Sequence, residues 1–526
     1  MLMGLPVSHA PYVTRLTRHR VLALVFAVFA GSALALGGCS GDDDSDSAAS
    51  SDDDATDDDS ADDDVADDDV DDDTDDDTGA DDDTLDDDAA DDDDTGPYAE
   101  DYCAYFLTGE VDLDGTDADG DGVPNGWDHC PNNPADSLDS DRDGIGNASD
   151  PDMDGDGTPN DEDADRDGDG ASDVDEDAAG TDPADPSSIP GLPRFDLDLG
   201  VWNPEPGWYT GDLHIHTEYS HDSVARLAWQ IGAARRAGFQ YLAITDHDVF
   251  EAPFDPAWDQ DDVLLLPGIE WGGAGGHANM WGIRTLQDAA SNAPDDIRAS
   301  WRHARLQGGV QSLNHYGGDK DDWDALFALA PDLFDELDTI EIWNIFWLFN
   351  ESTNEPSVAL WEDLLNEGYR IGAVGGGDVH YGPAFHITPA TVVYANSLSV
   401  PGILDGIRRG RTYITQADLL TFDGRPELDF RADGDGDGIF EAMLGDEVPP
   451  GTVTLQIDIK KAKGPVVVIR NGEVIARFAD HNYDADVHYT LEDDAPAGAW
   501  YRVEMRENGQ PWSMMRLMSS AIYVVD

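Results

Sequence analysis

The stretch that decides the fold of this chain is residues 207–217, which read GWYTGDLHIHT. It predicts a β-strand over 212–216, whose alternate side chains share one face, so the imidazoles of His214 and His216 can bind one ion. A lone histidine is more often a hydrogen-bonded residue of the core or surface. The H-x-H pair therefore indicates a metal site only if further ligand types occur at equivalent places in the fold.

The region from 191 to 417 alternates strand-like and helical patterns. Further strands are predicted at 241–245, 263–269, 277–283, 310–314, 339–343 and 371–374, and helices at 223–237, 294–306 and 356–366. This alternation predicts an α/β fold with a mostly parallel sheet closed into a barrel, whose site lies at the carboxyl ends of the strands.

Residue types that bind metals fall at those predicted strand ends. They are His214, His216, His247, Glu270, His277, His315, Asp378 and His380. Mixed imidazole and carboxylate ligands suit zinc, manganese or iron, so the pattern predicts a site for two to three divalent ions. Neither a GxSxG motif nor a candidate catalytic cysteine offers a competing nucleophile.

As a set, these motifs resemble the PHP family, the polymerase and histidinol phosphatase domain. The likeness rests on GWYTGDLHIHT, TDHD at 245–248, GHANMWGI at 276–283 and GGDVH at 376–380, and spans roughly residues 207–416. More narrowly, the segments look like the branch of PHP metallohydrolases named after carbaryl hydrolase. Amidohydrolase barrels commonly use a carbamylated lysine at a strand end, whereas the sole lysine of this region, Lys320, lies in a polar loop.

The resemblance implies a distorted PHP-type (β/α)7 barrel and a role for each ligand. One ion would be held by His214, His216, Glu270 and Asp378. Glu270 would also bridge to a second ion, bound by His277 and His315. A water activated between the ions would then attack a small phosphoester, or a carbamate or amide-type ester.

A third ion would be served by His247 and His380. The family often has an acidic or histidine ligand shortly after H-x-H, and here the chain offers His221, with Asp222 as the reserve. Asp246 and Asp248 are expected to orient ligands. The expected catalytic residues are Asp246, Glu270 and Asp378.

The composition is strongly acidic, with 115 Asp and Glu against 28 Lys and Arg and a formal net charge of -87. Sequence-independent binding of nucleic acid needs clustered Lys and Arg, which the chain lacks, so nucleic acid is excluded as a bulk partner. The scarcity of bases near the motifs also favours a small substrate over a polyphosphate.

The N-terminus predicts export. Three arginines precede an apolar run at 21–36, which ends in Leu36-Gly37-Gly38-Cys39. This tetrapeptide resembles the lipobox of bacterial lipoproteins, which implies a signal peptide over 1–38 and a lipid on Cys39 that tethers the protein to a membrane. An ordinary signal peptide or a membrane anchor with an incidental cysteine is the alternative. The expected location is the bacterial cell envelope, at the outer membrane or cell surface.

Residues 39–100 consist largely of DDD, DDDT and DDDV units, which predict a disordered, self-repelling linker. Between 101 and 190 the acids acquire a register, D-x-D-x-D-G-x-x-[DN]-x-x-[DE], that occurs four times. Its predicted carboxylate ligands are Asp117, Asp119, Asp121, Asp128, Asp139, Asp141, Asp143, Asp150, Asp152, Asp154, Asp156, Asp163, Asp165, Asp167, Asp169 and Glu176.

Calcium takes six to eight oxygens, which such a loop supplies around a glycine that permits the sharp bend. The loops resemble thrombospondin type 3 calcium repeats, which implies a calcium-wrapped rod; a disordered acidic linker with chance periodicity is the alternative. Cys103 and Cys130 are expected to form a disulfide in an exported protein, with a free pair as the alternative.

Residues 418–526 change to short alternating runs, with Asn471-Gly472 as a hairpin signal, and predict a C-terminal β-sandwich. Asp433, Asp435 and Asp437 begin another calcium-like loop there, although a solvated acidic turn explains it equally well. The alternative function for the whole chain is a calcium-dependent surface adhesion or binding protein, with a catalytically silent barrel and a surface partner.

Overall fold

The structure is a computed structural model that describes residues 130, 133–134, 136–197, 200–273, 276–286, 293–344, 351–380, 388–417, 424–506 and 515–525. The predictions for the signal peptide, Cys39, the acidic linker and the first repeat (Asp117, Asp119, Asp121 and Asp128) lie outside these residues. Cys130 is disulfide-bonded, while its expected partner Cys103 also lies outside them. Among the helices that the structure describes, none is long and apolar enough to cross a membrane.

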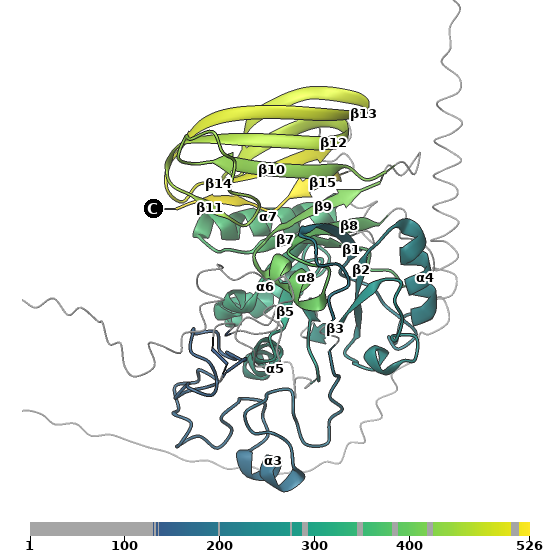
Figure 1. Cartoon of the computed structure of the whole chain (residues 1–526), viewed down its shortest axis with the longest axis vertical. Helices are drawn as coiled ribbons and strands as arrows, with labels where there is room; N and C mark the ends of the chain where they lie inside the picture. The colour runs from purple at the N-terminus through teal and green to yellow at the C-terminus, as the bar shows by residue number, and fades with distance from the viewer. Residues whose placement is uncertain are drawn as a thin grey trace, which may run out of the picture. The chain divides into compact units, whose positions relative to one another are not determined.

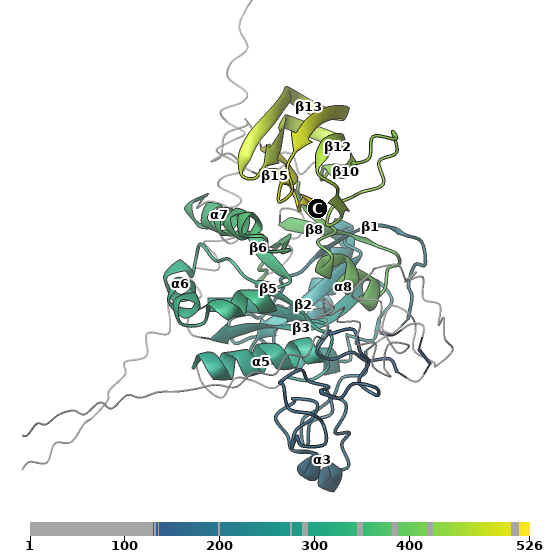
Figure 2. The same ribbon diagram turned by 90° about the vertical axis from the view of Figure 1, so that its left-hand side faces the viewer.

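A curled sheet forms the centre of the α/β part (Figures 1 and 2). Its strands are β1 (Gly207–Asp212), β2 (Tyr241–His247), β3 (Leu264–Gly273), β4 (Gly276–Trp281), β5 (Val310–Leu313), β6 (Thr339–Asn344), β7 (Gly372–Gly376), β8 (Pro389–Ala395) and β9 (Thr412–Gln416). They are hydrogen-bonded in the order β9-β8-β1-β2-β3-β4-β5-β6-β7. The predicted α/β class is confirmed, and the curvature fits a distorted barrel.

The strand directions differ from the prediction of a mostly parallel sheet. The pairs β1–β2, β2–β3, β5–β6 and β6–β7 are parallel, but β3–β4, β4–β5, β1–β8 and β8–β9 are antiparallel. The cause lies between β3 and β4, which only residues 274 and 275 connect. Two residues can close a hairpin but cannot hold the crossover that a parallel pair requires.

Threonine side chains join β7 to the other end of the curled sheet. Thr391 Oγ1 on β8 accepts a hydrogen bond from Gly375 N (2.9 Å) and donates one to Gly375 O (2.7 Å). Thr412 Oγ1 on β9 donates to Ala373 O at 2.8 Å. The two ends of the sheet therefore meet through side chains, which keeps the carboxyl ends of β1, β6 and β7 close together.

Helices cover the outside of the sheet. They are α4 (Leu227–Ala237), α5 (Pro294–Leu306), α6 (Lys320–Leu329), α7 (Glu351–Glu367) and α8 (Val400–Arg408), with 3-10 turns at Ala252–Phe254 and Pro331–Glu336. The predicted bounds of α5 are confirmed. Its buried Ile297, Trp301 and Ala304 recur at helical spacing, and Trp301 packs edge-on against Trp271 of β3 with ring centroids 5.7 Å apart.

The C-terminal part is all β. Its strands are β10 (Glu427–Asp433), β11 (Glu447–Val448), β12 (Gly451–Arg470), β13 (Glu473–Ala495), β14 (Trp500–Arg506), β15 (Met515–Ser519) and β16 (Ile522–Val524). Asn471 and Gly472 both have positive φ, 49° and 81°, as a tight turn between β12 and β13 requires. β15 pairs with β9, so these strands continue the barrel sheet by hydrogen bonds, and they form a second core to which Val392 of β8 and Tyr413 of β9 also belong.

Candidate metal centre

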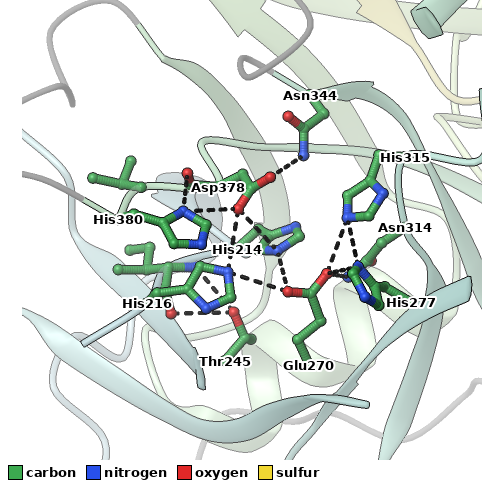
Figure 3. A network of polar contacts seen from close by, with 12 residues as sticks. His214, His216, Thr245, Glu270, His277, Asn314, His315, Asn344, Asp378 and His380 are labelled. Carbon is green, nitrogen blue, oxygen red and sulfur yellow. Dashed lines mark hydrogen bonds and ion pairs between the residues drawn. The ribbon is translucent and has the colours of Figure 1, made fainter. Parts of the chain in front are cut away.

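The strand that leads into the H-x-H motif ends earlier than predicted. β1 stops at Asp212, whose carboxylate accepts hydrogen bonds from the backbone of His214 (3.2 Å) and Gly377 (2.8 Å) and so turns the chain out of the ladder. His214 and His216 therefore lie in the segment after the strand. Their rings still face a common space, with centroids 5.2 Å apart (Figure 3).

Glu270, on β3, lies at the middle of the cluster and is almost completely buried. Its Oε2 is 3.1 Å from His214 Nε2, 3.2 Å from His216 Nε2 and 3.3 Å from His247 Nε2. Its Oε1 is 3.1 Å from His315 Nε2 and 3.5 Å from His277 Nδ1. The two oxygens of one carboxylate thus face two separate groups of imidazoles, which is the arrangement of a bridging ligand (Figure 3).

Asp378 completes the first group. Its Oδ1 lies 3.2 Å from His216 Nε2 and 3.6 Å from His214 Nε2. The ligand atoms of His214, His216, Glu270 and Asp378 all lie within 4.8 Å of one another. Asp378 has a positive φ of 47°, a conformation that few side-chain-bearing residues adopt, so the backbone after β7 is bent to bring this carboxylate inward.

The second group contains the two predicted histidines and one residue that the sequence reasoning missed. His277 Nδ1 and His315 Nε2 lie 3.4 Å apart and both face Glu270 Oε1. Asp319 Oδ2 lies 3.0 Å from His315 Nδ1 and 3.8 Å from His277 Nδ1. Asp319 directly precedes α6 in the polar segment GGDKDD, where nothing in the sequence separates it from its acidic neighbours.

The third group contains Asp222, the reserve to His221 in the sequence prediction. His247, His380 and His216 gather around Asp222, whose Oδ2 lies 2.6 Å from His380 Nε2 and 3.4 Å from His247 Nε2. His221, the preferred ligand, is exposed, and its ring centroid lies 5.1 Å from that of His247. Ser220 Oγ donates to Asp222 Oδ1 at 2.7 Å, which turns Asp222 toward the histidines.

The donor atoms fit divalent ions. Ligands of a tetrahedral ion with bonds of about 2.1 Å lie about 3.4 Å apart, close to the spacing within the first and second groups. Nε2 of His214 and of His216 are buried and make no hydrogen bond within the described residues, although carboxylate oxygens lie near them. Nitrogens directed at a shared space, rather than along an N–H···O line, are what an ion between them requires.

The charges of the cluster are strongly coupled. Burial alone would raise the pKa of Glu270, but His214, His216 and His315 lower it well below its ordinary value. Burial would likewise depress the pKa of His214, yet Glu270, Glu341 and Asp378 raise it well above 6.5. The carboxylates therefore stay ionised and require positive charge beside them, which protons on the imidazoles or metal ions can supply.

Two predicted residues act on the backbone. Asp246 accepts hydrogen bonds from the amide and the hydroxyl of Thr217, the latter at 2.6 Å, and so fixes the segment after His216. Asp248 accepts one from Gly272 N at 2.7 Å and steadies the end of β3 beyond Glu270. Among the described contacts, Asp246 thus fixes the backbone beside His216, and its catalytic role stays a prediction.

Two further polar residues were missed. Asn314 Nδ2 donates to Glu270 Oε1 at 3.0 Å. Glu341 Oε1 lies 3.1 Å from His214 Nδ1. A signal for Glu341 did exist, because it is the single acidic residue within the otherwise apolar run TIEIW of a predicted strand.

The three described repeats share one loop geometry. The backbone amide of the frame's glycine donates to the first Asp in each, from Gly144 to Asp139 (3.1 Å), Gly157 to Asp152 (2.9 Å) and Gly170 to Asp165 (2.9 Å). These glycines have φ of 96°, 92° and 89°. Asp139, Asp141 and Asp143 bring ligand oxygens within 4.8 Å of one another.

The fourth repeat buries carboxylates without giving all of their oxygens a hydrogen-bond partner, which is energetically unfavourable. Asp167, Asp169 and Glu176 are fully buried, and one or both carboxylate oxygens of each have no hydrogen-bond partner within the described residues. Burial, together with Asp169 and Glu176, raises the pKa of Asp167 to about 8. The remaining predicted ligands of the described repeats lie in the same loops: Asp150, Asp154, Asp156 and Asp163.

The comparison with protein families agrees with the motif resemblance. The family model of the PHP domain matches residues 212–289. No curated protein matches the chain. Among solved structures, a two-domain protein from Bacteroides vulgatus that contains a predicted PHP-like metal-dependent phosphoesterase is 18% identical, with a TM-score of 0.35, and the alignment covers 62% of this chain and 98% of that one. An amidohydrolase from Chromobacterium violaceum is 15% identical, with a TM-score of 0.24, over 32% of this chain and 87% of that one.

Proposed function

We propose that the chain is a metal-dependent hydrolase that cleaves a small phosphoester, or a carbamate or amide-type ester. The observation that carries the proposal is Glu270, a buried carboxylate whose two oxygens face separate groups of imidazoles. Divalent ions bound there would lower the pKa of a bound water and polarise the oxygens of the attacked group.

The residues of the centre favour an anionic substrate. Five carboxylates of the centre lie 3.2 Å or less from an imidazole nitrogen, and their five negative charges are fewer than the six positive charges of three divalent ions: Glu270, Asp378, Asp222, Asp319 and Glu341. The loaded centre would therefore be positively charged inside a strongly acidic chain and would attract a phosphoester more than a neutral ester. Zinc, manganese and iron all suit this ligand set.

The test uses the full chain after removal and controlled return of metal. We expect two to three equivalents of zinc, manganese or iron by elemental analysis, and turnover in a panel of phosphomonoesters, phosphodiesters and carbamates. Replacement of His214 and His216 by Ala should abolish turnover. A chain that stays folded yet binds no transition metal and cleaves nothing would overturn the proposal.

The second candidate is a calcium-dependent surface adhesion protein with a silent barrel. The observation in its favour is the set of acidic loops from 139 to 176. An enzyme that acts on small molecules does not need these loops for its chemistry. The same His214 and His216 variant separates the two functions. An adhesion protein would keep binding to its surface partner and would have no turnover to lose.

We also propose that the protein is exported, anchored by a lipid on Cys39 and held in the cell envelope. The supporting feature is the sequence Leu36-Gly37-Gly38-Cys39 after an apolar run. Cells that express the full chain should hold it in the membrane fraction until detergent is added. Replacing Cys39 by Ala should prevent lipid labelling, and unchanged labelling would count against the anchor.

Calcium in the repeats is the third part of the proposal. The buried carboxylate oxygens of Asp167, Asp169 and Glu176 support it, since such groups need a cation or a proton. Calorimetric titration of the full chain with calcium should detect several sites. Replacing Glu176 by Gln should remove one of them, and an unchanged stoichiometry would contradict the assignment of that loop.

A further inference from the structure

Glu341 contacts both halves of the metal centre without being among its predicted ligands. It lies on β6 and is 2% exposed. Its Oε1 is 3.1 Å from His214 Nδ1, on the side of the ring opposite to the nitrogen that faces Glu270. Its Oε2 accepts hydrogen bonds from the backbone amide of His315 (3.1 Å) and from Asn344 Nδ2 (3.0 Å).

The contact with His214 favours one tautomer of the ring once a metal ion is bound. A carboxylate only accepts hydrogen bonds, so when an ion takes the lone pair of Nε2 the ring proton sits on Nδ1 and is donated to Glu341. This Nε2 is the nitrogen directed at Glu270 and Asp378. Such an outer carboxylate fixes both the tautomer and the orientation of a metal-binding imidazole.

The other two contacts act on strained parts of the centre. His315 has a positive φ of 24°, which a histidine adopts only when its surroundings hold it there, and Glu341 accepts the amide hydrogen of that residue. Asn344, bound to Glu341, also lies 3.4 Å from Asp378 Oδ2. One carboxylate thus touches a ligand of the first group, the backbone of a ligand of the second, and a neighbour of Asp378.

We propose that Glu341 is a positioning residue that orients His214 and couples the two ion sites joined by Glu270. This inference rests on the proposed metal-dependent function. Gly376 on β7 is part of the same arrangement, because a Cβ at that position would lie 2.4 Å from both Glu341 Oε1 and His214 Cβ. A side chain there would force the carboxylate and the imidazole apart without removing any ligand.

The test is a cobalt titration of the metal-depleted full chain, followed by the visible absorption of Co2+ and by competition with a chelator. The variants are Glu341→Gln and Gly376→Ala, with Asp405→Asn as the control, since Asp405 on α8 is another buried carboxylate but pairs with Arg409. We expect the two test variants to bind the tightest Co2+ about 10- to 100-fold more weakly, with altered absorption bands, and the control to stay within about twofold of the wild type.

The outcomes separate this inference from the function on which it rests. If the wild type takes up no Co2+, the proposed function fails. If the wild type binds Co2+ and Glu341→Gln binds it with unchanged affinity and spectrum, the positioning role is wrong while the function stands, whatever Gly376→Ala does, because a Cβ at that position also meets His214 itself. Thermal unfolding of the metal-free variants detects a general loss of folding, and if Glu341→Gln does not fold, unchanged Co2+ binding by Gly376→Ala overturns the positioning role.

Discussion

The proposed third ion site depends on which of two neighbouring side chains supplies a ligand. Asp222 faces His380 and His247, whereas His221 is exposed. Either residue suits the spacing after H-x-H, so only the turn made by Ser220 and Asp222 distinguishes them. We predict that Asp222→Asn loses one metal equivalent and at least about tenfold in turnover, because the carboxylate that joins the two imidazoles is gone.

The neighbouring substitution His221→Ala is the matched control for this prediction. It should keep the full metal content and near wild-type turnover, since the exposed ring contributes no ligand. Elemental analysis and the rate on one substrate measure both effects. Metal loss in His221→Ala, together with retention in Asp222→Asn, would restore the assignment drawn from the sequence.

His303 on α5 gives the protein a pH-dependent stability. It is 2% exposed, its Nε2 donates to Pro186 O at 2.7 Å, and burial lowers its pKa from 6.5 to about 4. Below pH 6.5 the unfolded chain binds a proton at this histidine, whereas the folded chain binds it only near pH 4. The free energy of unfolding is therefore highest above pH 6.5 and decreases as the pH is lowered to about 4. At about pH 5 the loss is about 2 kcal/mol.

The variant His303→Gln isolates this contribution, since Gln keeps a donor for Pro186 but does not titrate. Urea unfolding of both proteins at neutral pH and near pH 5 should show a smaller acid-induced loss in the variant. The other histidines titrate in both proteins and cancel in the comparison. Equal losses would mean that His303 is as easily protonated in the folded chain as in the unfolded one.

Helix α5 is the element on which the acidic repeats rest. Arg302 Nη2 donates to Asp154 O and lies 3.2 Å from Asp154 Oδ2, and Arg305 Nη2 donates to Asp141 O at 3.4 Å. Gly168 also approaches this helix, since a Cβ there would lie 3.0 Å from Leu306. The described repeats are therefore packed against the barrel. The resemblance to calcium repeats implied a rod and did not predict this packing.

We predict that Arg302→Ala loosens the repeats without unfolding the barrel. The lost contacts with Asp154 are worth roughly 1–2 kcal/mol, so backbone amides of residues 136–170 should exchange with deuterium roughly 5- to 30-fold faster. Arg298→Ala, on the same helix, removes only ion pairs with Asp295 and Asp332 and should leave that exchange unchanged. Equal protection in both variants would mean that the arginine does not hold the repeats.

Local patterns predicted α5 and the strands β2 to β7, but they missed β8 and β9 and placed the first strand at 212–216 rather than at Gly207–Asp212. The bounds of α5 were anticipated to the residue, because Pro294 opens it and an apolar stripe runs to Leu306. The end of β1 and the direction of β4 were not, since the first depends on a hydrogen bond from Gly377 to Asp212 and the second on a two-residue connection. The first depends on a residue far away in the sequence and the second on the length of a connection, and apolar periodicity contains neither kind of information.

The same distinction applies to the metal centre. Residues at strand ends, such as His247, Glu270 and His315, could be named because parallel strands bring their carboxyl ends together. Asp319 and Glu341 could not, because their roles come from neighbours on other elements. A frame such as H-x-H predicts ligands, whereas the residues that orient them follow only from three-dimensional contact.

At the scale of the whole molecule, the acidic repeats and the strand that carries Glu270 both contact the region around α5. Arg142, within the second repeat, donates to Gly309 O at 2.7 Å and pairs with Asp338. Helix α5, which contacts the repeats through Arg302 and Arg305, also packs Trp301 against Trp271, the residue after Glu270. The ring centroids of Trp301 and Trp323 lie 6.0 Å apart. A continuous set of contacts thus links the loops to the strand that carries the bridging carboxylate.

This continuity predicts that calcium stabilises the barrel and not only the repeats. Metal-depleted full chain should unfold at a higher temperature when calcium alone is returned, because a ligand at about 100 times its Kd adds about 2.7 kcal/mol to whatever unfolds with its site. For a domain of this size each kcal/mol raises the unfolding temperature by about 2–4 °C. Differential scanning calorimetry measures the shift, and magnesium at equal ionic strength controls for general screening of the acidic surface.

The paired substitution of Arg142 and Arg302 by Ala shows whether the docking contacts transmit this effect. Calcium should still bind the loops of that variant, since no ligand is changed, but the barrel transition should rise by much less than in the wild type. If the barrel transition of the wild type ignores calcium while a separate repeat transition moves, the two parts unfold independently. The arginines would then hold the loops in place without passing any stability to the metal centre, and calcium would act on the repeats alone.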